Sequence, residues 1–168
     1  HGKSYKGTFS LHRLGNVNKR LKDFPLSVQT VKKDFRVTLG ALECTTDDGN
    51  SYKLTGELIT SDFIEAAEAE SYIVSKMEKK TLLITWDHSA DLVHRFTITG
   101  IESSENEQEL TVTWDGNRGG IKQKGSSTVK IPPQGKFTVL DVIAVNGENQ
   151  RIDIVFSDPV DPSSDLNG

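Results

Sequence analysis

The chain has 168 residues, of which 35% are hydrophobic and 26% charged, and its formal net charge is −4. These values are close to the soluble globular average and exclude an intrinsically disordered chain, and the slight acidity disfavours a nucleic-acid partner, which requires clustered Lys and Arg. No apolar stretch approaches the ~20 residues that span a bilayer as a helix, and a lone cysteine excludes an intrachain disulfide and a cysteine zinc site.

Two strands are predicted before residue 31. The one basic cluster of the chain, VNKRLK at residues 17–22, separates them. We interpret this cluster as a solvated strand or turn, with an anion-binding patch as the alternative. The apolar residues of the two strands are Phe9, Leu11 and Leu14, then Phe24, Leu26 and Val28.

A hairpin is predicted between residues 35 and 58, because apolar and polar residues alternate on both sides of the sequence DDGN at 47–50. Asp, Asn and Gly tolerate positive φ and favour tight turns. Cys44 precedes the turn and is predicted to be a small, half-buried strand residue. The alternating apolar residues are Phe35, Val37 and Leu39, then Tyr52, Leu54 and Leu58.

One stretch breaks the period-2 pattern and predicts a helix over residues 62–76. Ser61 or Asp62 can cap it, Glu65 lies in its first turn, and an Ala- and Glu-rich run follows. An acidic first half and a basic end at 76–80 suit the helix dipole. The residues that could cover a sheet edge are Ile64, Ala67, Tyr72, Ile73 and Met77.

Four further strands are predicted at 82–86, 96–101, 110–114 and 129–131, separated by polar turns. Two of them carry the dipeptides Trp86-Asp87 and Trp114-Asp115, which contain both tryptophans of the chain. A propeller requires several copies at a period of ~40 residues, so we interpret each Trp as the last core-facing residue of its strand and each Asp as the start of a turn. Short strands with turns at this spacing predict an all-β, antiparallel sandwich or barrel, and we take the sandwich as the fold.

An internal echo indicates tandem domains. The stretches that start at Asp34 and at Gly135 both open with Phe-x-Val, at Phe35 and at Phe137, turn through Gly and Asn, and close on Ser-Asp at 61–62 and 157–158. Each stretch is predicted to be the opening hairpin of a domain, and the second follows the proline-containing connector IPPQG, which is typical of a domain boundary.

We therefore predict closing strands of a preceding β-domain at 1–30, a complete sandwich at 31–133, and a linker with the opening hairpin of a following sandwich at 134–168. The alternative is that the strands near the two termini pair with each other in a second small sheet. The first interpretation makes the chain part of a tandem array. The start at His1, without an initiator Met, indicates a processed or excised segment.

The motifs in this order resemble the N-terminal region of bacterial alpha-2-macroglobulin-family proteins, particularly the Bacteroidetes type, over nearly the whole chain. The resemblance implies an Ig-like or macroglobulin-like β-sandwich with one short helix, in a long protein of the bacterial envelope, periplasmic or lipid-anchored. The motifs are LGNVNKRLKDFPLSVQTVKKDF (14–35), YKLTGELITSD (52–62), LLITWDHSADLVHRFTITGI (82–101), LTVTWDG (110–116), KGSSTVKIPPQGKFTVLDV (124–142) and QRIDIVFSDPVDPSSDLNG (150–168).

The family is thought to trap proteases: cleavage of a bait segment triggers a rearrangement that entangles the attacker, and many members carry a Cys-Gly-Glu-Gln thioester. Neither active part is identified here, because Cys44 lies in LECTT and no stretch reads as bait. The resemblance therefore implies a non-catalytic scaffold segment, whose partners are adjacent macroglobulin-like domains and, through the full-length parent, target proteases.

No residue is assigned to a catalytic, cofactor or metal site, although three groups were weighed. His88 and His94 with Asp87 and Asp91 could bind zinc, but their spacing suits a hairpin with its turn at 89–91, where the side chains need not converge. The loop at 116–125 could cradle phosphate, but a strand and not a helix follows it, so we expect a hairpin loop. The third group, a possible calcium loop that we expect to form turns and caps, comprises Ser157, Asp158, Asp161, Ser163 and Asp165.

The leading hypothesis is thus a scaffold segment of a protease-trapping envelope protein, with no enzymatic activity of its own. The alternative is an Ig-like module of a surface adhesin or glycan-binding protein, which an exposed aromatic platform would favour. Aromatic residues are only 7% of the chain, and most occupy alternating strand positions that read as core. Enzyme activity in this segment is the third and least supported interpretation.

Overall fold

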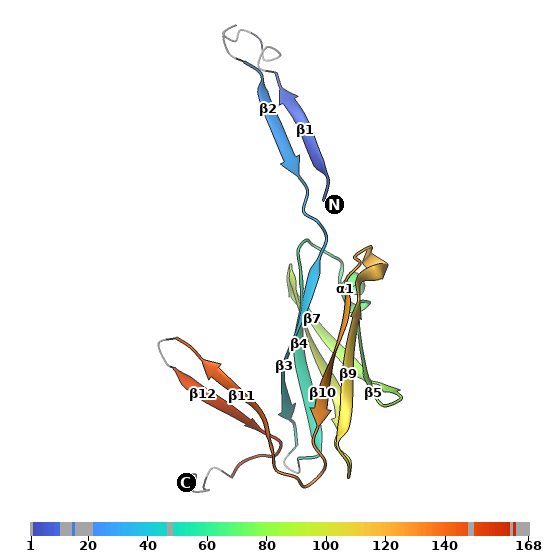
Figure 1. The fold of residues 1–168 in the computed structure, drawn as a ribbon, viewed down its shortest axis with the longest axis vertical. Helices are drawn as coiled ribbons and strands as arrows, with labels where there is room; N and C mark the ends of the chain where they lie inside the picture. Colours follow the sequence, from blue (N-terminus) through green and yellow to red (C-terminus); the bar gives the residue numbers. More distant parts are fainter. Residues whose placement is uncertain are drawn as a thin grey trace.

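The computed structural model describes residues 2–10, 15, 22–46, 49–147, 150–161 and 163. Strands dominate it, with one short α-helix and a 3₁₀ turn (Figure 1). The elements are β1 (Ser4–Phe9), β2 (Phe24–Gln29), β3 (Phe35–Cys44), β4 (Ser51–Thr60), α1 (Ala66–Glu70), β5 (Ile73–Met77), β6 (Lys80–Thr81), β7 (Leu83–Ala90), β8 (Val93–Glu102), β9 (Gln108–Asp115), η2 (Gly116–Gly119), β10 (Lys124–Ile131), β11 (Val139–Val145) and β12 (Arg151–Phe156).

Two four-stranded sheets form a sandwich, with strand orders β3-β4-β8-β7 and β10-β9-β5-β6. Every pairing is antiparallel. Two packed antiparallel sheets with this order correspond to the ABED and GFC arrangement of immunoglobulin-type domains. The predicted antiparallel all-β sandwich is confirmed.

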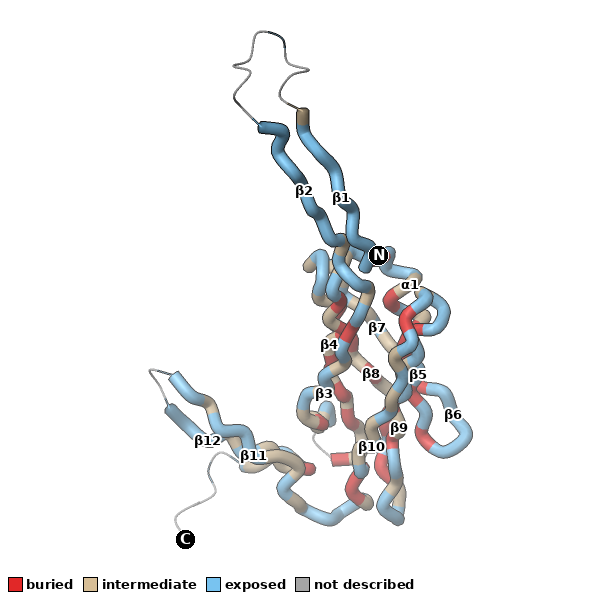
Figure 2. The backbone as a smooth tube through the Cα atoms, turned by 45° about the horizontal axis from the view of Figure 1, so that its top comes forward, coloured by how far each residue is buried: buried red, intermediate tan, exposed pale blue. Residues whose placement is uncertain are grey.

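The core lies between the two sheets (Figure 2). Strand β4 alternates strictly, so that its inward side chains are buried while their neighbours are half-exposed. Burying one Leu, Ile or Phe contributes about 1.5–3 kcal/mol, and this face is what selects the register. The central buried side chains are Leu54, Leu58, Phe96, Ile98, Ile101, Leu110, Val112 and Ile131.

The predicted helix over 62–76 is wrong in extent, because α1 contains only Ala66–Glu70 and its N-cap residue is Glu65. From Ile73 the chain becomes strand β5, whose residues are alternately buried and exposed and pair with β9. Helix propensity of the Ala- and Glu-rich run therefore prevails for only one turn. Beyond it, pairing with β9 and burial of Ile73 and Met77 decide the structure.

Both tryptophans pack against the core, as predicted. Asp115 opens a turn, since its carboxylate accepts a hydrogen bond from Asn117 N at 2.9 Å and caps η2. Asp87 instead lies at an irregularity within the hairpin, because β7 continues to Ala90 and His88 follows Trp86 on the same side of the strand. Trp86 is therefore not the last inward residue of β7.

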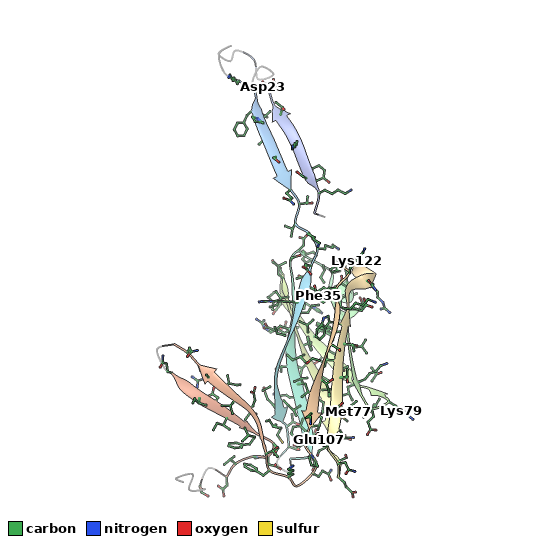
Figure 3. All side chains as sticks on the ribbon, viewed as in Figure 1. Asp23, Phe35, Met77, Lys79, Glu107 and Lys122 are labelled. Atoms are coloured by element: carbon green, nitrogen blue, oxygen red, sulfur yellow. The ribbon has the colours of Figure 1, made fainter. Side chains whose placement is uncertain are left out.

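Two separate hairpins flank the sandwich. Strands β1 and β2 extend beyond the end where β3 begins, and β11 and β12 lie beside the other end (Figure 1). We call these the upper and lower ends; Phe35 and Lys122 mark the upper end and Glu107 the lower one (Figure 3). Each hairpin pairs within itself, so the alternative of a shared sheet of terminal strands is wrong for the described strands.

Candidate functional site

His88 and His94 meet across the β7–β8 hairpin, although the sequence suggested that they need not converge. Their Nδ1 atoms are 2.8 Å apart. His88 Nε2 lies 3.2 Å from Glu70 Oε1 of α1, and its ring stacks on Trp86. The turn lies at Asp91 and Leu92, whereas the sequence predicted it at residues 89–91.

The hydrogen bonds assign the protons of this pair. With Glu70 accepting from His88 Nε2–H, neutral His88 presents an unprotonated Nδ1 that accepts from His94 Nδ1–H. His94 Nε2 is then the unprotonated nitrogen, and it is buried without a hydrogen-bond partner. A second proton on His94 would leave a buried N–H unsatisfied beside another imidazole.

Burial, and then the neighbouring His88, lower the pKa of His94 from its ordinary value. In the folded state the ring therefore stays neutral at pH values where the unfolded chain, with a His pKa of about 6.5, already binds a proton. The contribution of neutral His94 to the free energy of unfolding is fully present above the unfolded pKa of about 6.5, and it is lost as the pH falls toward the lower pKa of the folded state. The groups that face His94 are His88 and, through it, Glu70.

We expect urea unfolding at pH 5 to show a lower midpoint than at pH 7.5, and His94→Phe to remove much of that difference. Phe keeps an apolar ring at a position that is 3% exposed and cannot take up a proton. His88→Phe is the control for the half-exposed partner and should retain the part of the pH dependence that arises from burial of His94. An unchanged pH dependence in His94→Phe would contradict this assignment.

Asp87 does not converge with the histidine pair. Asp87 accepts from Ser89 N at 2.9 Å, and its side chain lies on the other face of β7 from His88. Across the described ranges, no cluster of three His, Cys, Asp or Glu residues could hold a metal ion.

The residues weighed as a calcium loop form two separate local turns. Asp158 Oδ2 accepts from Ser157 Oγ at 2.6 Å, and Asp161 Oδ1 accepts from Ser163 N and Oγ at 2.8 and 2.7 Å. Those bonds to Ser163 lower the pKa of Asp161. Asp165 lies outside the described residues. The turn-and-cap interpretation accounts for the four residues that the structure describes.

The predicted loop at 116–125 does join β9 to β10, as expected of a hairpin loop, but Lys124 and Gly125 already belong to β10. Cys44, the last residue of β3, is half-buried and its Sγ lies 3.1 Å from Thr46 O, as predicted for a structural strand residue. Of the basic cluster at 17–22, only Lys22 is among the described residues.

The outer face of the β3-β4-β8-β7 sheet is hollowed by a trough of about 570 Å³. Glu57 and Arg95 form an ion pair at its rim, with 3.2 Å between Oε1 and Nε. Exposed ion pairs of this kind contribute little, about 0–1 kcal/mol. The trough is lined by four threonines, by charged and glycine residues, and by Trp86 and Phe96, which both pack in or against the core.

The most specific polar contacts lie where the β11–β12 hairpin meets the lower end of the sandwich. The Tyr52 hydroxyl reaches the Gly49 and Ser157 carbonyl oxygens at 2.9 and 3.1 Å. Burial is the main cause that raises the Tyr52 pKa to about 12, so the hydroxyl remains a donor at neutral pH. Leu140 of β11 also packs against the core.

A second set of hydrogen bonds at this junction closes the base of the β11–β12 hairpin. Ser157 Oγ accepts from Thr138 N at 2.8 Å, Ser157 N donates to Thr138 O at 2.9 Å, and Ser157 Oγ lies 3.2 Å from Lys136 O. We call this pattern the hydroxyl clamp: a hydroxyl residue directly after a hairpin binds both backbone groups of the residue directly before it.

The hydroxyl clamp recurs at the other hairpin that closes on Ser-Asp. Ser61 Oγ accepts from Asp34 N at 2.8 Å and donates to Lys32 O at 2.8 Å, and Ser61 N donates to Asp34 O at 2.9 Å. In the sequence, the repeated Ser-Asp at 61–62 and 157–158 was the signal for this shared arrangement. The clamp aligns Phe35 with Val139, two residues away from the Phe35–Phe137 match that the sequence echo implied.

The β1–β2 hairpin carries the clamp through Thr30, which receives Lys3 N on Oγ1 at 3.0 Å and donates its N–H to Lys3 O at 2.9 Å. Relative to the clamp, however, the apolar side chains of β1–β2 lie on the face opposite to the one that is apolar in β3–β4. In β3–β4 the pair nearest the clamp, Phe35 and Thr60, is buried in the core, whereas in β1–β2 the corresponding Ser4–Gln29 pair is polar.

Comparisons with protein-family models, with curated proteins and with solved structures each returned no match. None of the helices in the described ranges is long and apolar enough to cross a membrane.

Proposed function

We propose that the chain is a non-catalytic scaffold segment of a bacterial alpha-2-macroglobulin-like envelope protein that traps proteases. The observation that carries this proposal is the β11–β12 hairpin, which repeats the hydroxyl clamp of β3–β4 and is seated on the lower end of the sandwich by Tyr52. A module whose end receives the opening hairpin of another is the repeating unit of a tandem array, and the sequence motifs resemble this family.

The unpartnered hairpin faces support the division into 1–30, 31–133 and 134–168. Large apolar side chains on one face of a two-stranded hairpin need a second layer, since an isolated hairpin is marginally stable. In β11–β12 the strand pair nearest the clamp, Val139 and Phe156, is apolar, which fits an opening hairpin like β3–β4. In β1–β2 the corresponding pair is polar, which fits a closing hairpin. The exposed apolar residues on these faces are Tyr5, Phe9, Phe24, Leu26 and Val28 in the first hairpin, and Phe137, Val139, Val142, Ile152 and Ile154 in the second; Ile143, opposite Asp153, is also exposed but on the other face of β11–β12.

In this role the segment positions its neighbours and transmits conformational change. The clamp fixes the angle at which a linker enters each hairpin, because Ser61 binds Lys32 O and Ser157 lies beside Lys136 O. Adjacent macroglobulin-like domains are the direct partners, and target proteases are reached through the full-length parent. The setting is the periplasm or the cell envelope.

A glycan-binding module would need an exposed aromatic face, and the exposed Tyr5, Phe9 and Phe24 lie on the β1–β2 face that this proposal assigns to the preceding domain. Trp86 and Trp114 both pack against the core, and the indole of Trp114 also covers Gly125 of β10. The aromatic residues that line the trough on the outer face, Trp86 and Phe96, pack in or against the core.

The test is entrapment by the full-length parent. Incubation with trypsin should leave the protease bound to the parent and shielded from a large protein substrate, yet still active on a small chromogenic peptide. Heat-inactivated trypsin is the control, because it cannot cleave a bait segment. Protease that is neither retained nor shielded would reject the proposed function.

A further inference from the structure

Each of the two flanking hairpins has one apolar face that is exposed to solvent. The large apolar side chains of both faces are 46–67% exposed, apart from the half-buried Phe156. The facing pairs on the β1–β2 face are Tyr5–Val28, Gly7–Leu26 and Phe9–Phe24. The facing pairs on the β11–β12 face are Val139–Phe156, Val142–Ile154 and Ala144–Ile152, with the Phe137 ring stacked on Phe156.

The sandwich itself shows how two such faces cover each other. Its opening hairpin, β3–β4, belongs to one sheet, and its closing hairpin, β9–β10, belongs to the opposite sheet (Figure 1). Their inward side chains share one core, in which Leu54 and Leu58 of the first hairpin join Leu110 and Val112 of the second. The chain carries one further hairpin of each kind, so β11–β12 and β1–β2 each present half of a core of this type.

The two flanking hairpins also match in length and are opposite in charge. Strands β1, β2 and β12 each contain six residues and β11 contains seven, so each face is about 20 Å long at about 3.3 Å per residue. Residues 1–30 contain six Lys and Arg against one acidic residue, whereas residues 134–168 contain two against six. Opposite charges favour the encounter of one hairpin with the other and oppose the pairing of either hairpin with its own kind.

We propose that the apolar face of β11–β12 in one copy of this chain packs against the apolar face of β1–β2 in a second copy. The two hairpins of one molecule lie at opposite ends of the sandwich (Figure 1), so this contact joins different molecules. The inference rests on the proposed function, in which β1–β2 closes one domain and β11–β12 opens another, so that each face requires a hairpin of the other kind. The contact is heterologous and leaves one free face at each end of the pair, so further copies can add to it.

The experiment uses two full-length variants, each with one face blocked. Leu26→Asp blocks the β1–β2 face and leaves β11–β12 free, whereas Ile154→Asp blocks the β11–β12 face and leaves β1–β2 free. A carboxylate buried in an apolar contact without a partner is unfavourable, so each change should weaken its contact at least about tenfold. Both side chains are exposed, so neither change removes a contact of the sandwich core.

Sedimentation velocity at about 0.1–1 mM, suited to a small and weak interface, should show monomers of each blocked variant alone and a 1:1 complex in their mixture. Wild-type protein should form species larger than a dimer as its concentration rises, because each copy has both faces. Ser27→Asp and Ile143→Asp are the matched controls, since they place the same charge on the other face of each hairpin. Both controls should still associate.

Two results would overturn the proposed contact. A mixture of the blocked variants that stays monomeric would show that the two hairpins do not pair. Association of one blocked variant by itself would show that a hairpin face pairs with its own kind. Far-UV circular dichroism and amide hydrogen exchange establish that the sandwich and both hairpins remain folded; if a hairpin loses protection, Val28→Asp replaces Leu26→Asp and Ile152→Asp replaces Ile154→Asp.

The contact and the proposed function fail in distinguishable ways, because entrapment of trypsin by the full-length parent is measured independently. Loss of association with trapping intact rejects the hairpin contact alone. Association without trapping rejects the protease-trapping role and leaves the contact between the two hairpins in place.

Discussion

Replacing Phe96 by Ala is expected to lower the free energy of unfolding by about 3–5 kcal/mol, the range for truncation of a buried aromatic residue. The Phe96 ring is 2% exposed, covers Gly56 of β4 and lies 5.1 Å from the Trp86 ring. Gly56, the residue of β4 directly opposite Phe96, has no side chain that could fill the space that the ring leaves. Small domains have only about 5–15 kcal/mol of stability, so this variant should be close to unfolded at 37 °C.

The measurement is urea unfolding followed by far-UV circular dichroism, because Trp86 touches the substituted side chain and its fluorescence would change for local reasons. Thr97→Ala is the matched control: it lies on the same strand but its side chain borders the outer trough, and it should cost less than about 1 kcal/mol. Equal losses in the two variants would show that Phe96 does not hold the sheets together in this way.

The sequence predicted the sandwich because period-2 alternation reports directly on which strand face is buried. Phe35, Leu54 and Leu58 were identified as inward residues from that alternation alone, and all three are buried. The loop between β9 and β10 was also predictable, since Asn and Gly favour tight turns through their own backbone preferences. The predicted turn at 47–50 includes residues 47 and 48, which lie outside the described residues.

The helix over 62–76 was wrong because local propensity and tertiary pairing compete there. Ala66–Glu70 is helical, but the next segment pairs with β9, more than thirty residues further along. Nothing in the local composition reveals that partner. A β-branched residue at position 73, with alternating burial of Ile73, Ser75 and Met77, was the signal for a strand, and the surrounding Ala and Glu residues outweighed it.

The contacts at the candidate sites were least predictable, because they depend on register. His88 and His94 meet because the register that pairs Trp86 with Phe96 and Asp87 with Arg95 brings the next two residues to facing positions on β7 and β8. The bond from Tyr52 to Ser157 joins residues 105 positions apart. The repeated Ser-Asp did indicate a structural role after a strand, but the clamp that gives it this role appears only when both ends of each hairpin are seen together.

Ser157→Ala is expected to detach the β11–β12 hairpin while leaving the sandwich folded. The change removes the acceptor of the Thr138 N–H at a position that is nearly inaccessible to water. An unsatisfied buried donor costs about 1–3 kcal/mol, which is large for a two-stranded hairpin that is marginally stable by itself. Amide hydrogen exchange should show loss of protection at Val142 and Ile154, with protection at Leu54 unchanged.

Ser61→Ala is the matched control, because Ser61 makes the same clamp at an exposed position. Water can replace its hydroxyl there, and β4 is also held by β8 on its other side, so we expect a loss of about 0.5–1.5 kcal/mol and no detachment. Retained protection in β11–β12 of Ser157→Ala would mean that Tyr52 and Leu140 suffice to seat the hairpin. If the hairpin detaches in Ser157→Ala and β3–β4 stays in place in Ser61→Ala, the same three clamp contacts are essential only where Tyr52 buries them.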